Sequence, residues 1–358
     1  LTFRLSVFIM SDVSAVILAG GKGTRLRPLT VFTPKPIVPM MNRPFIAFQL
    51  EMLAAAGVGK AVLSLSYQPN KIEDAIGDGS QYRSKVSFVT EPNPLGTSGA
   101  FRYAADETVQ TFVVLNGDIL TDIDLAKVLE QHRSAKADAT IVLVEVEDPT
   151  RYGLVETDGD GRVERFLEKP KAEDVPNLRS RNINAGIYIL ERSVLDLIPH
   201  GEHSSFEFNI FPTMLEKGLN FRSFLLGNGY WRDIGNPSSY LQAHLDFLAG
   251  KVGLSLPKTD SQSEIATAAS VDGVSLIGEG CVIKPNATVR NSVLGPGVML
   301  EEKAVVENSV IWAHSRIAAG AAVHGSVVGR SSFIGRSSSI TDGTVLGDKA
   351  TIPDYSIT

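Results

Sequence analysis

Hydrophobic and polar positions alternate in two different ways along the chain, and the pattern changes near residue 250. Before that point, short runs rich in β-branched residues alternate with amphipathic segments, which predicts strands and helices in succession. The predicted strands read AVIL, AVLSLS, VSFVT, TFVVL and ATIVLVEV. The segment RPFIAFQLEMLAAAG predicts a helix with Pro44 in its first turn and Gly57 at its end. This succession favours an α/β domain with a mixed, mostly parallel sheet, whose ligands bind beyond the carboxyl ends of the strands.

The remainder of the chain repeats every 17 residues. An aliphatic residue recurs at about every sixth position, and a small residue often follows it four positions later. The aliphatic set is Ile277, Ile283, Val289, Leu294, Leu300, Val306, Ile311, Ile317, Val323, Val328, Ile334 and Ile340, and the small set includes Cys281, Ala287, Ala304, Ser315, Ala321 and Ser332. This period is typical of a parallel β-helix of hexapeptide repeats, with the aliphatics inside a triangular prism and one corner a residue short. We expect Val298, Trp312 and Phe333, outside this register, on the outer faces.

The two patterns predict a domain at residues 11–250, a linker at 251–264 and a β-helix at 265–358, with Ile265 and Val271 starting the first coil. We interpret residues 1–9 as an upstream extension, because Met10 followed by SDVSAVILAGG looks like a natural start.

Composition narrows the possible partners. The net charge is −6 and no long basic run is present, which argues against nucleic acid and anionic membranes as partners. No apolar run approaches the roughly 20 residues that span a membrane. The single cysteine, Cys281, excludes an intrachain disulfide and fits a reducing cytoplasm, and a packed corner position explains it best. The six histidines are scattered, which makes a zinc site improbable.

The stretch LAGGKGTRLRPLT at residues 18–30 is the first candidate for chemistry. It is not a Walker loop, because Gly23 follows Lys22 where a hydroxyl residue should stand. It is not a dinucleotide fingerprint either, because Leu26 replaces the third glycine. A glycine loop after a first strand nevertheless commonly binds phosphate, and Arg25 supplies a planar fork for phosphate oxygens. Lys35, between two prolines, is held on a stiffened segment and can place a charge near phosphate.

The longer stretch ILAGGKGTRLRPLTVFTPKPIVPMMNRPFI resembles the signature of sugar-1-phosphate nucleotidylyltransferases. The motifs EPNPLGTSGAF, VLNGD, YGLVE, FLEKP, NAGIY and YWRDIG follow in the family's order over roughly residues 13–250. PLGTSGA, WRDIG and the hexapeptide tail are most similar to mannose-1-phosphate guanylyltransferases. The resemblance implies a Rossmann-like nucleotidyltransferase domain followed by a left-handed β-helix. It also implies transfer of a nucleotidyl group from a nucleoside triphosphate, GTP by preference, to a sugar 1-phosphate, mannose 1-phosphate by preference, with release of pyrophosphate.

The resemblance also implies roles for individual residues. It assigns catalysis to Arg25, Lys35, Asp118 and Asp233, and nucleotide binding to Leu18, Gly20, Gly21, Gly23, Thr24, Arg25, Gly96 and Asp118. It assigns binding of the sugar phosphate to Gly153, Glu168, Lys169 and Asn184. Asp118 and Asp233 would bind Mg²⁺, an ion suited to carboxylate, phosphate and water oxygens. Asp122 and Asp124 are nearby alternatives to Asp118, although Asp124 is more simply a helix N-cap.

Other functions stay open at this point. The same chemistry could serve a heptose 1-phosphate with GTP, or a hexose 1-phosphate with UTP or dTTP. A regulatory paralogue without activity is a second class, against which Arg25, Lys35, Asp118 and Asp233 argue. A β-helix that is also an acyltransferase is a third. Open coil ends expose strand edges, so we expect the tail to pack on the catalytic domain, on another copy of itself, or both, giving a homo-oligomer. We expect it to supply assembly and stability rather than chemistry.

Overall fold

The computed structural model describes residues 10–175, 178–255 and 262–358, and the chain divides into two compact units. The first unit comprises the segment up to Gly21 and Ile46–Trp231, and the second comprises Lys22–Phe45 and Arg232–Thr358. The expected extension at residues 1–9 and the part of the expected linker at 256–261 lie outside the described residues. The glycine stretch therefore begins in one unit and continues in the other.

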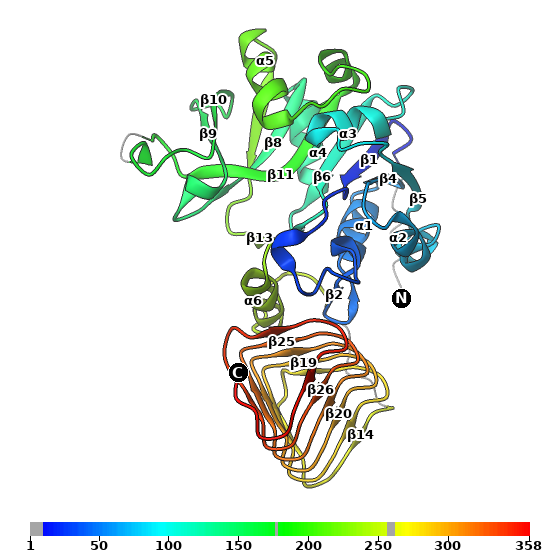
Figure 1. Ribbon diagram of the computed structural model, residues 1–358. Helices are drawn as coiled ribbons and strands as arrows, with labels where there is room; N and C mark the ends of the chain where they lie inside the picture. Colours follow the sequence, from blue (N-terminus) through cyan, green and yellow to red (C-terminus); the bar gives the residue numbers. More distant parts are fainter. Residues whose placement is uncertain (1–9, 176–177, 256–261) are drawn as a thin grey trace, which may run out of the picture. The chain divides into compact units, whose positions relative to one another are not determined.

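The first unit is built on a nine-stranded mixed sheet (Figure 1). Its main path has the order β10-β9-β11-β6-β1-β4-β5, and β8 joins β11 to β12. The strands are β1 (Val13–Leu18), β4 (Lys60–Leu65), β5 (Lys85–Thr90), β6 (Thr111–Asn116), β8 (Ala139–Glu145), β9 (Gly153–Thr157), β10 (Val163–Glu168), β11 (Asn182–Glu191) and β12 (Phe221–Leu225). β1 runs parallel to both β4 and β6, and β11 runs antiparallel to β6 and β8. All five strands expected from β-branched runs are confirmed, and the continuous apolar character of β1, β6 and β8 follows from burial on both faces of the sheet, whereas β5 at its edge is more exposed.

Helices of the first unit connect and cover these strands (Figure 1). The α-helices are α1 (Ile46–Ala55), α2 (Pro69–Ile76), α3 (Gly96–Ala104), α4 (Leu125–Ser134) and α5 (Phe211–Glu216). Short helical segments of other types are η3 (Ser80–Tyr82), η4 (Pro149–Arg151), η6 (Arg192–Leu197) and η7 (Phe206–Ile210). The unit also contains the short strand β7 (Ile119–Thr121). Not one of the helices within the described ranges has the length and apolar character needed to cross a membrane.

The helix predicted from Pro44 starts later than expected. Pro44 lies in β3 (Arg43–Pro44), which pairs with β2 (Pro39–Met40) in a two-residue hairpin of the second unit. Met41 and Asn42 make its turn with φ of 49° and 62°. The hairpin closes where the Phe45 N–H donates to the Val38 carbonyl at 3.0 Å. Arg43, Pro44 and Phe45, which the pattern had placed in the helix, therefore belong to the hairpin, and α1 begins at Ile46.

The second unit contains η1 (Thr24–Leu26), η2 (Lys35–Ile37), the end of β13 (Trp231–Asp233), α6 (Pro237–Leu248) and a β-helix whose coils stack as triangular turns (Figure 1). Its three faces are parallel sheets: β14 (Glu264–Ile265), β17 (Val282–Ile283), β20 (Met299–Leu300), β23 (Arg316–Ile317), β26 (Phe333–Ile334) and β29 (Thr351–Ile352); β15 (Ser270–Val271), β18 (Thr288–Arg290), β21 (Val305–Glu307), β24 (Ala322–His324) and β27 (Ser339–Ile340); β16 (Leu276–Ile277), β19 (Val293–Leu294), β22 (Val310–Ile311), β25 (Val327–Val328) and β28 (Val345–Leu346). The predicted aliphatic positions are all buried in one core, as are the small corner residues of that prediction. The hexapeptide β-helix is thus confirmed.

The coil length is 17 residues in the middle of the stack and 18 at its ends. Leu276 pairs with Val293, whereas Ser270 pairs with Thr288 and Phe333 pairs with Thr351. The backbone turns at the corners through positive φ, as at Gly280, Gly297 and His314 or at Asn286, Lys303 and Gly320. Glycine and asparagine recur there because they adopt this conformation at low cost.

Two of the residues expected on outer faces are buried. Val298 is 0% exposed and belongs to the core, because it stands four residues after Leu294, at the inward corner position. Trp312 is 1% exposed, because it packs edge-to-face against Tyr240 of α6 with 6.3 Å between ring centroids. Phe333 is half-buried, with the Arg316 guanidinium 5.7 Å from its ring centroid.

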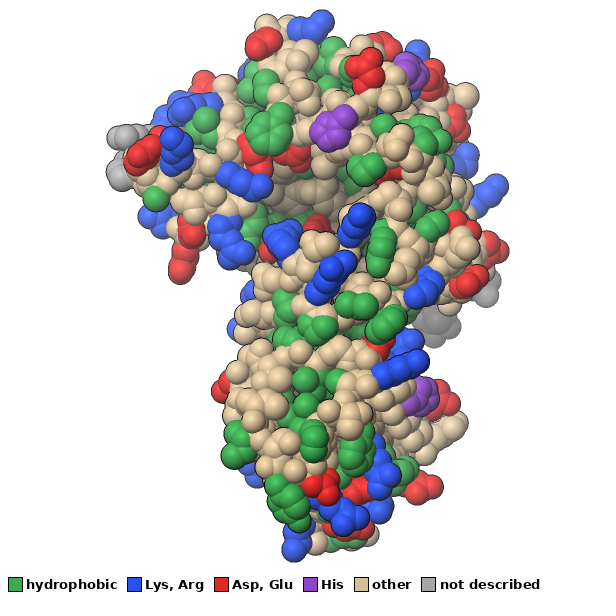
Figure 2. All heavy atoms as spheres, in the orientation of Figure 1, with side chains coloured by type: hydrophobic (Ala, Val, Ile, Leu, Met, Phe, Trp, Pro, Cys, Tyr) green, Lys and Arg blue, Asp and Glu red, His purple; other side chains and the backbone are tan. Residues whose placement is uncertain are grey.

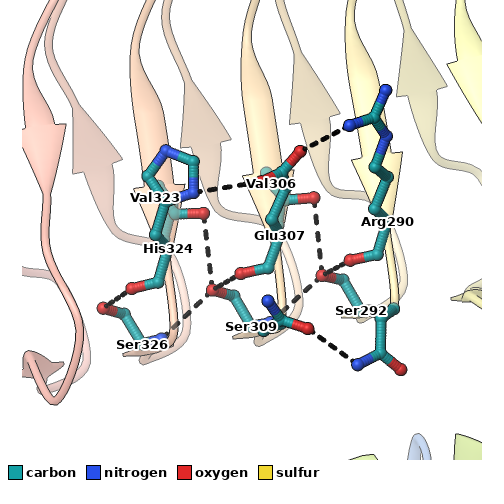
Figure 3. Close-up of polar contacts among 10 residues, drawn as sticks. Arg290, Ser292, Val306, Glu307, Ser309, Val323, His324 and Ser326 are labelled. Atoms are coloured by element: carbon teal, nitrogen blue, oxygen red, sulfur yellow. Dashed lines mark hydrogen bonds and ion pairs between the residues drawn. The ribbon is translucent and has the colours of Figure 1, made fainter.

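Four successive 17-residue repeats begin with a serine, at Ser275, Ser292, Ser309 and Ser326, and hydrogen bonds between neighbouring coils explain this. The amide of Ser309 donates to the Ser292 hydroxyl at 3.1 Å, and the amide of Ser326 donates to that of Ser309 at 3.1 Å (Figure 3). On the neighbouring strands, Glu307 lies between two basic side chains (Figure 3). Its Oε1 is 3.2 Å from Arg290 Nη1, and its Oε2 is 3.4 Å from His324 Nδ1. The hydroxyls satisfy buried backbone donors at a corner that the sheets cannot reach.

Hydrophobic side chains are also exposed on the coils (Figure 2). Ile265 and Val274 in the first coil are 44% and 51% exposed, and Tyr355 and Ile357 in the last coil are 75% and 82% exposed. Apolar exposure is therefore present in both terminal coils of the stack.

Candidate active site

A cavity of about 250 Å³ lies in the first unit beyond the end of β1. Its walls are Leu18, Gly20, Gly21, Ser66, Glu91, Pro94, Gly96, Thr97 and Ala100. Four of the residues that the resemblance assigned to the nucleotide, Leu18, Gly20, Gly21 and Gly96, therefore line one cavity. Its position at a strand end, beside the start of α3, is where ligands of such sheets bind.

At two of these positions, neighbouring atoms leave no room for a side chain, which explains the glycine. A Cβ on Gly20 would lie 2.8 Å from Glu91 Oε1. A Cβ on Gly96, which has φ +75°, would lie 2.4 Å from the carbonyl oxygen of Ser204. Gly21 differs, because a Cβ there would meet no atom within 4 Å. The protein itself therefore does not require glycine at residue 21, which leaves room for a ligand as the reason.

The cavity contains a carboxylate that sequence reasoning did not single out. Glu91 is 9% exposed. Its Oε1 accepts from the Ser64 hydroxyl at 3.0 Å, and its Oε2 accepts from the Leu95 amide at 3.1 Å. Each carboxylate oxygen has a second lone pair, so Glu91 can still accept hydrogen bonds from a ligand. The motif EPNPLG contained this signal, but only the structure shows that the side chain reaches the cavity wall.

The residues assigned to the sugar lie on β9, β10 and β11. Gly153 pairs with Glu168 across β9 and β10, and a Cβ on Gly153 would lie 2.9 Å from Glu168 Oε2. Asn184 donates through Nδ2 to the Tyr188 hydroxyl at 2.9 Å and accepts at Oδ1 from the Gly186 amide at 2.9 Å. These bonds fix the Asn184 amide at an irregularity in the β11–β8 register.

Lys169 follows Glu168 directly and turns outward. It has φ of 49°, and its Nζ lies 3.5 Å from Glu168 Oε1. Its side chain is 66% exposed, so it stands at the solvent side of this group.

Glu168 has an unusual neighbour in Glu207, which sequence reasoning missed. Burial, with a further contribution from the negative charge of Glu207, raises the pKa of the Glu168 carboxyl, and Lys169 opposes this shift. Glu207 accepts hydrogen bonds from the hydroxyls of Thr97 at 2.8 Å and Ser205 at 2.6 Å. Since Thr97 also lines the cavity, Glu207 links the cavity to the sugar group. A carboxylate at η7, 110 residues from Thr97 in sequence, has no local signal that could have indicated this role.

The aromatic core behind these strands holds the group in place. Tyr188 packs against Phe206 and Phe211 with ring centroids 5.2 Å and 5.3 Å apart. Phe166 of β10 packs on Phe211 at 5.1 Å. Because these rings are large and interlocked, they fix η7 against β10 and β11 and thereby fix Glu207 near Glu168.

The second unit contains Gly23, Thr24, Arg25, Lys35 and Asp233. Gly23, with φ +60°, precedes η1, and its carbonyl accepts from the Thr30 hydroxyl at 2.7 Å. A Cβ on Gly23 would lie 3.2 Å from the Lys35 Cβ, so the turn and Lys35 pack together. Arg25 is exposed at its own turn, as is Thr24.

Arg25 and Asp233 both lie against Gly235. A Cβ there would be 2.7 Å from Asp233 Oδ2 and 3.2 Å from Arg25 Nη2. Within the second unit, the structure thus places one cation and one carboxylate of the predicted set around the same small residue.

The candidate metal ligands are oxygen donors at two strand ends. Asp118 stands two residues after the end of β6 and Asp233 ends β13, and both are half-buried. Within the described ranges, no three His, Cys, Asp or Glu side chains gather closely enough to hold a metal ion. Each of the two carboxylates, Asp118 in the first unit and Asp233 in the second, offers the oxygen donors that hard divalent cations prefer.

The alternative carboxylates have structural partners. Asp124 caps α4 by accepting from the Lys127 amide at 3.3 Å, which confirms the predicted N-cap. Asp122 accepts from the Tyr230 amide at 2.7 Å.

Comparison with known proteins identifies the family of the chain. A profile described as nucleotidyl transferase matches residues 14–250. The chain belongs to the nucleotidyl transferase family. A second profile, described as the EIF2B subunit epsilon LbH domain, matches residues 259–357, in agreement with the left-handed β-helix. Nucleotidyl transferases of this kind generally use a divalent metal.

Named relatives narrow the comparison. A mannose-1-phosphate guanylyltransferase of Mycobacterium tuberculosis is 43% identical over 67% of this chain and 66% of that protein, just under two thirds of its length. Mannose-1-phosphate guanylyltransferase 1 of Arabidopsis thaliana is 38% identical over 77% of this chain and 76% of that protein. The structure of HddC from Yersinia pseudotuberculosis complexed with GMP-PN is similar with a TM-score of 0.55 and 35% identity, and covers 65% of this chain and 99% of that one.

Proposed function

We propose that this nucleotidyl transferase joins GTP to mannose 1-phosphate, releasing pyrophosphate and forming a nucleotide sugar. The observation that carries the proposal is Glu91, a buried carboxylate on the wall of the cavity. Guanine presents N1–H and N2–H donors side by side, and an ionised carboxylate only accepts. Uracil and thymine have a single N–H between two carbonyl oxygens, and adenine has no ring N–H on that edge. A carboxylate therefore matches guanine best, and the names of the relatives support the same base.

In this proposal, the sugar 1-phosphate oxygen attacks the α-phosphorus in line, and pyrophosphate leaves. Glu168 and Asn184 accept and donate hydrogen bonds to sugar hydroxyls, and Lys169 faces the sugar phosphate. Arg25 and Lys35 place positive charge beside the phosphates, where negative charge grows in the transition state. Asp118 and Asp233 would hold Mg²⁺, which supplies charge neutralisation to the phosphate oxygens.

The test is a panel of substrates with the full chain. GTP, UTP, dTTP and ATP are each combined with mannose, glucose and heptose 1-phosphates, and pyrophosphate release is measured. We expect the highest kcat/KM with GTP and mannose 1-phosphate. A preference for UTP or dTTP would contradict the role of Glu91, and a preference for heptose 1-phosphate would keep the base and replace the sugar.

A further inference from the structure

The segment that carries Arg25 and Lys35 is anchored by residues far later in the chain, all within the second unit. Asn42, in the β2–β3 turn, donates through Nδ2 to the carbonyl of Leu294 in β19 at 2.8 Å, across 252 residues. The Tyr240 hydroxyl of α6 donates to the carbonyl of Pro39 in β2, across 201 residues. The β-helix and the helix before it therefore bond to both ends of this hairpin.

Trp312 of the β-helix sets the direction of the Tyr240 bond. Its indole N–H donates to the Tyr240 hydroxyl oxygen at 3.0 Å, and both side chains are at most 1% exposed. Because the indole can only donate, the hydroxyl must accept from it and direct its own proton to Pro39. Burial raises the pKa of Tyr240, so the hydroxyl retains that proton.

The anchored carbonyl lies close to Lys35 along the backbone. Lys35 opens η2, and the Val38 amide donates to the Lys35 carbonyl at 3.2 Å. Pro39 follows immediately, and Pro34 and Pro36 stiffen the approach. A backbone held at Lys35 and at Pro39 leaves few conformations for the residues between them, so the bond at Pro39 restrains the lysine.

We propose that Trp312 and Tyr240 are positioning residues, through which a coil of the β-helix holds Lys35 in its catalytic place. This rests on the proposed function, in which Lys35 acts on the phosphates. It revises the sequence-based expectation that the tail supplies assembly and stability alone. A change of about 1 Å in the placement of a catalytic group can reduce a rate by about 100-fold, so a single indirect hydrogen bond can matter to turnover.

The test compares Tyr240→Phe and Trp312→Phe in the full chain with the matched control Tyr355→Phe, whose ring is exposed in the last coil. With GTP and mannose 1-phosphate, we expect each network variant to lower kcat about fivefold or more, as loss of one hydrogen bond of about 1 kcal/mol allows. KM for the sugar phosphate should stay within about twofold, because the proposed sugar contacts are untouched. In a Lys35→Ala background, Tyr240→Phe should change kcat by less than about twofold, since both act on one group.

Hydrogen exchange gives a second arm that does not depend on activity. In Tyr240→Phe, amides at residues 35–45 should exchange faster, and amides at 327–340 should not change. The proposal is overturned if both network variants keep wild-type kcat, if Tyr240→Phe retains its full effect without Lys35, or if exchange at 35–45 is unaltered. A wild-type chain that releases no pyrophosphate would instead refute the proposed function, and the exchange arm would still decide the inference.

Discussion

At the scale of single residues, we propose that the carboxylate of Glu91 determines which base the cavity accepts. Replacing it with glutamine keeps its size but exchanges one acceptor for an N–H₂ donor, which would face a guanine donor. We expect Glu91→Gln to lower kcat/KM for GTP by about 10- to 100-fold, through one lost hydrogen bond and one unpaired donor. The ratio of UTP to GTP turnover should rise. Glu130→Gln, on the exposed side of α4, is the matched control.

The aspartates give a second prediction with an internal control. Asp118→Ala and Asp233→Ala should each abolish pyrophosphate release, because in the proposed site either change leaves the metal with one carboxylate ligand instead of two. Asp124→Ala should leave turnover largely intact and lower the free energy of unfolding by about 1 kcal/mol, since it removes the N-cap of α4. Steady-state kinetics and urea denaturation measure both effects. An essential Asp124 with a dispensable Asp118 would refute the assignment.

Residues were predictable where their chemistry is local. Glycines after a strand, an arginine beside them and a lysine between prolines can each be recognised as candidate site residues from a short stretch of sequence. Glu91, Glu207 and Trp312 were not assigned roles, because their roles depend on contacts with residues elsewhere in the sequence. Glu207 meets Thr97 across 110 residues and Trp312 meets Tyr240 across 72 residues, and periodicity does not encode such pairs.

At the scale of elements, α6 contains a group that makes stability depend on pH. His244 is 0% exposed in the interior of the second unit. Burial lowers its pKa from the usual value of 6.5 to about 4. Between these values the unfolded chain binds the extra proton and the folded chain does not, so stability is full above pH 6.5 and is lost as the pH falls towards about 4.

The expected loss is on the order of 3 kcal/mol across that interval. His244→Gln keeps a donor for the Tyr240 carbonyl, which His244 Nδ1 contacts at 2.9 Å, but does not titrate. Urea denaturation at several pH values should therefore give a flatter profile for this variant than for wild type. His314→Gln, at an exposed corner, should keep the wild-type slope. Parallel profiles for all three chains would show that His244 is not the group responsible.

Elements of the two halves differ in how well the sequence predicts them. Five strands follow from short runs of β-branched residues, and the coils of the β-helix follow from a side-chain period of six, which burial of the aliphatic residues enforces. The predicted start of α1 was wrong because backbone hydrogen bonds form the β2–β3 hairpin, and such bonds produce no pattern of apolar residues in the sequence. The longer terminal coils escaped the 17-residue repeat because one inserted residue moves a corner without changing which side chains face inward.

At the scale of the whole molecule, we propose that the β-helix assembles chains into a homo-oligomer. Tyr355 and Ile357 are mostly exposed in the last coil, and no strand within the described residues pairs with the far edge of β29. An uncovered edge with apolar side chains favours association with another chain. Light scattering should show the wild-type chain as a multimer and Tyr355→Lys/Ile357→Lys as a smaller species, with kcat per chain within about twofold. A monomeric wild-type chain would contradict the proposal.

The bond between Asn42 and Leu294 has a consequence for synthesis of the chain. Asn42 leaves the ribosome 252 residues before its partner, an interval of about 13 to 50 s at typical elongation rates. During that time the hairpin lacks the β-helix, so the nascent protein holds the segment that carries Arg25 and Lys35 without its final support. Arrested chains that end before Leu294 should be cleaved by protease at residues 22–45, and chains that extend well past Trp312 should resist. Full activity would then begin only after the coils that contain Leu294 and Trp312 have been made, which makes these coils a checkpoint on the synthesis of the second unit.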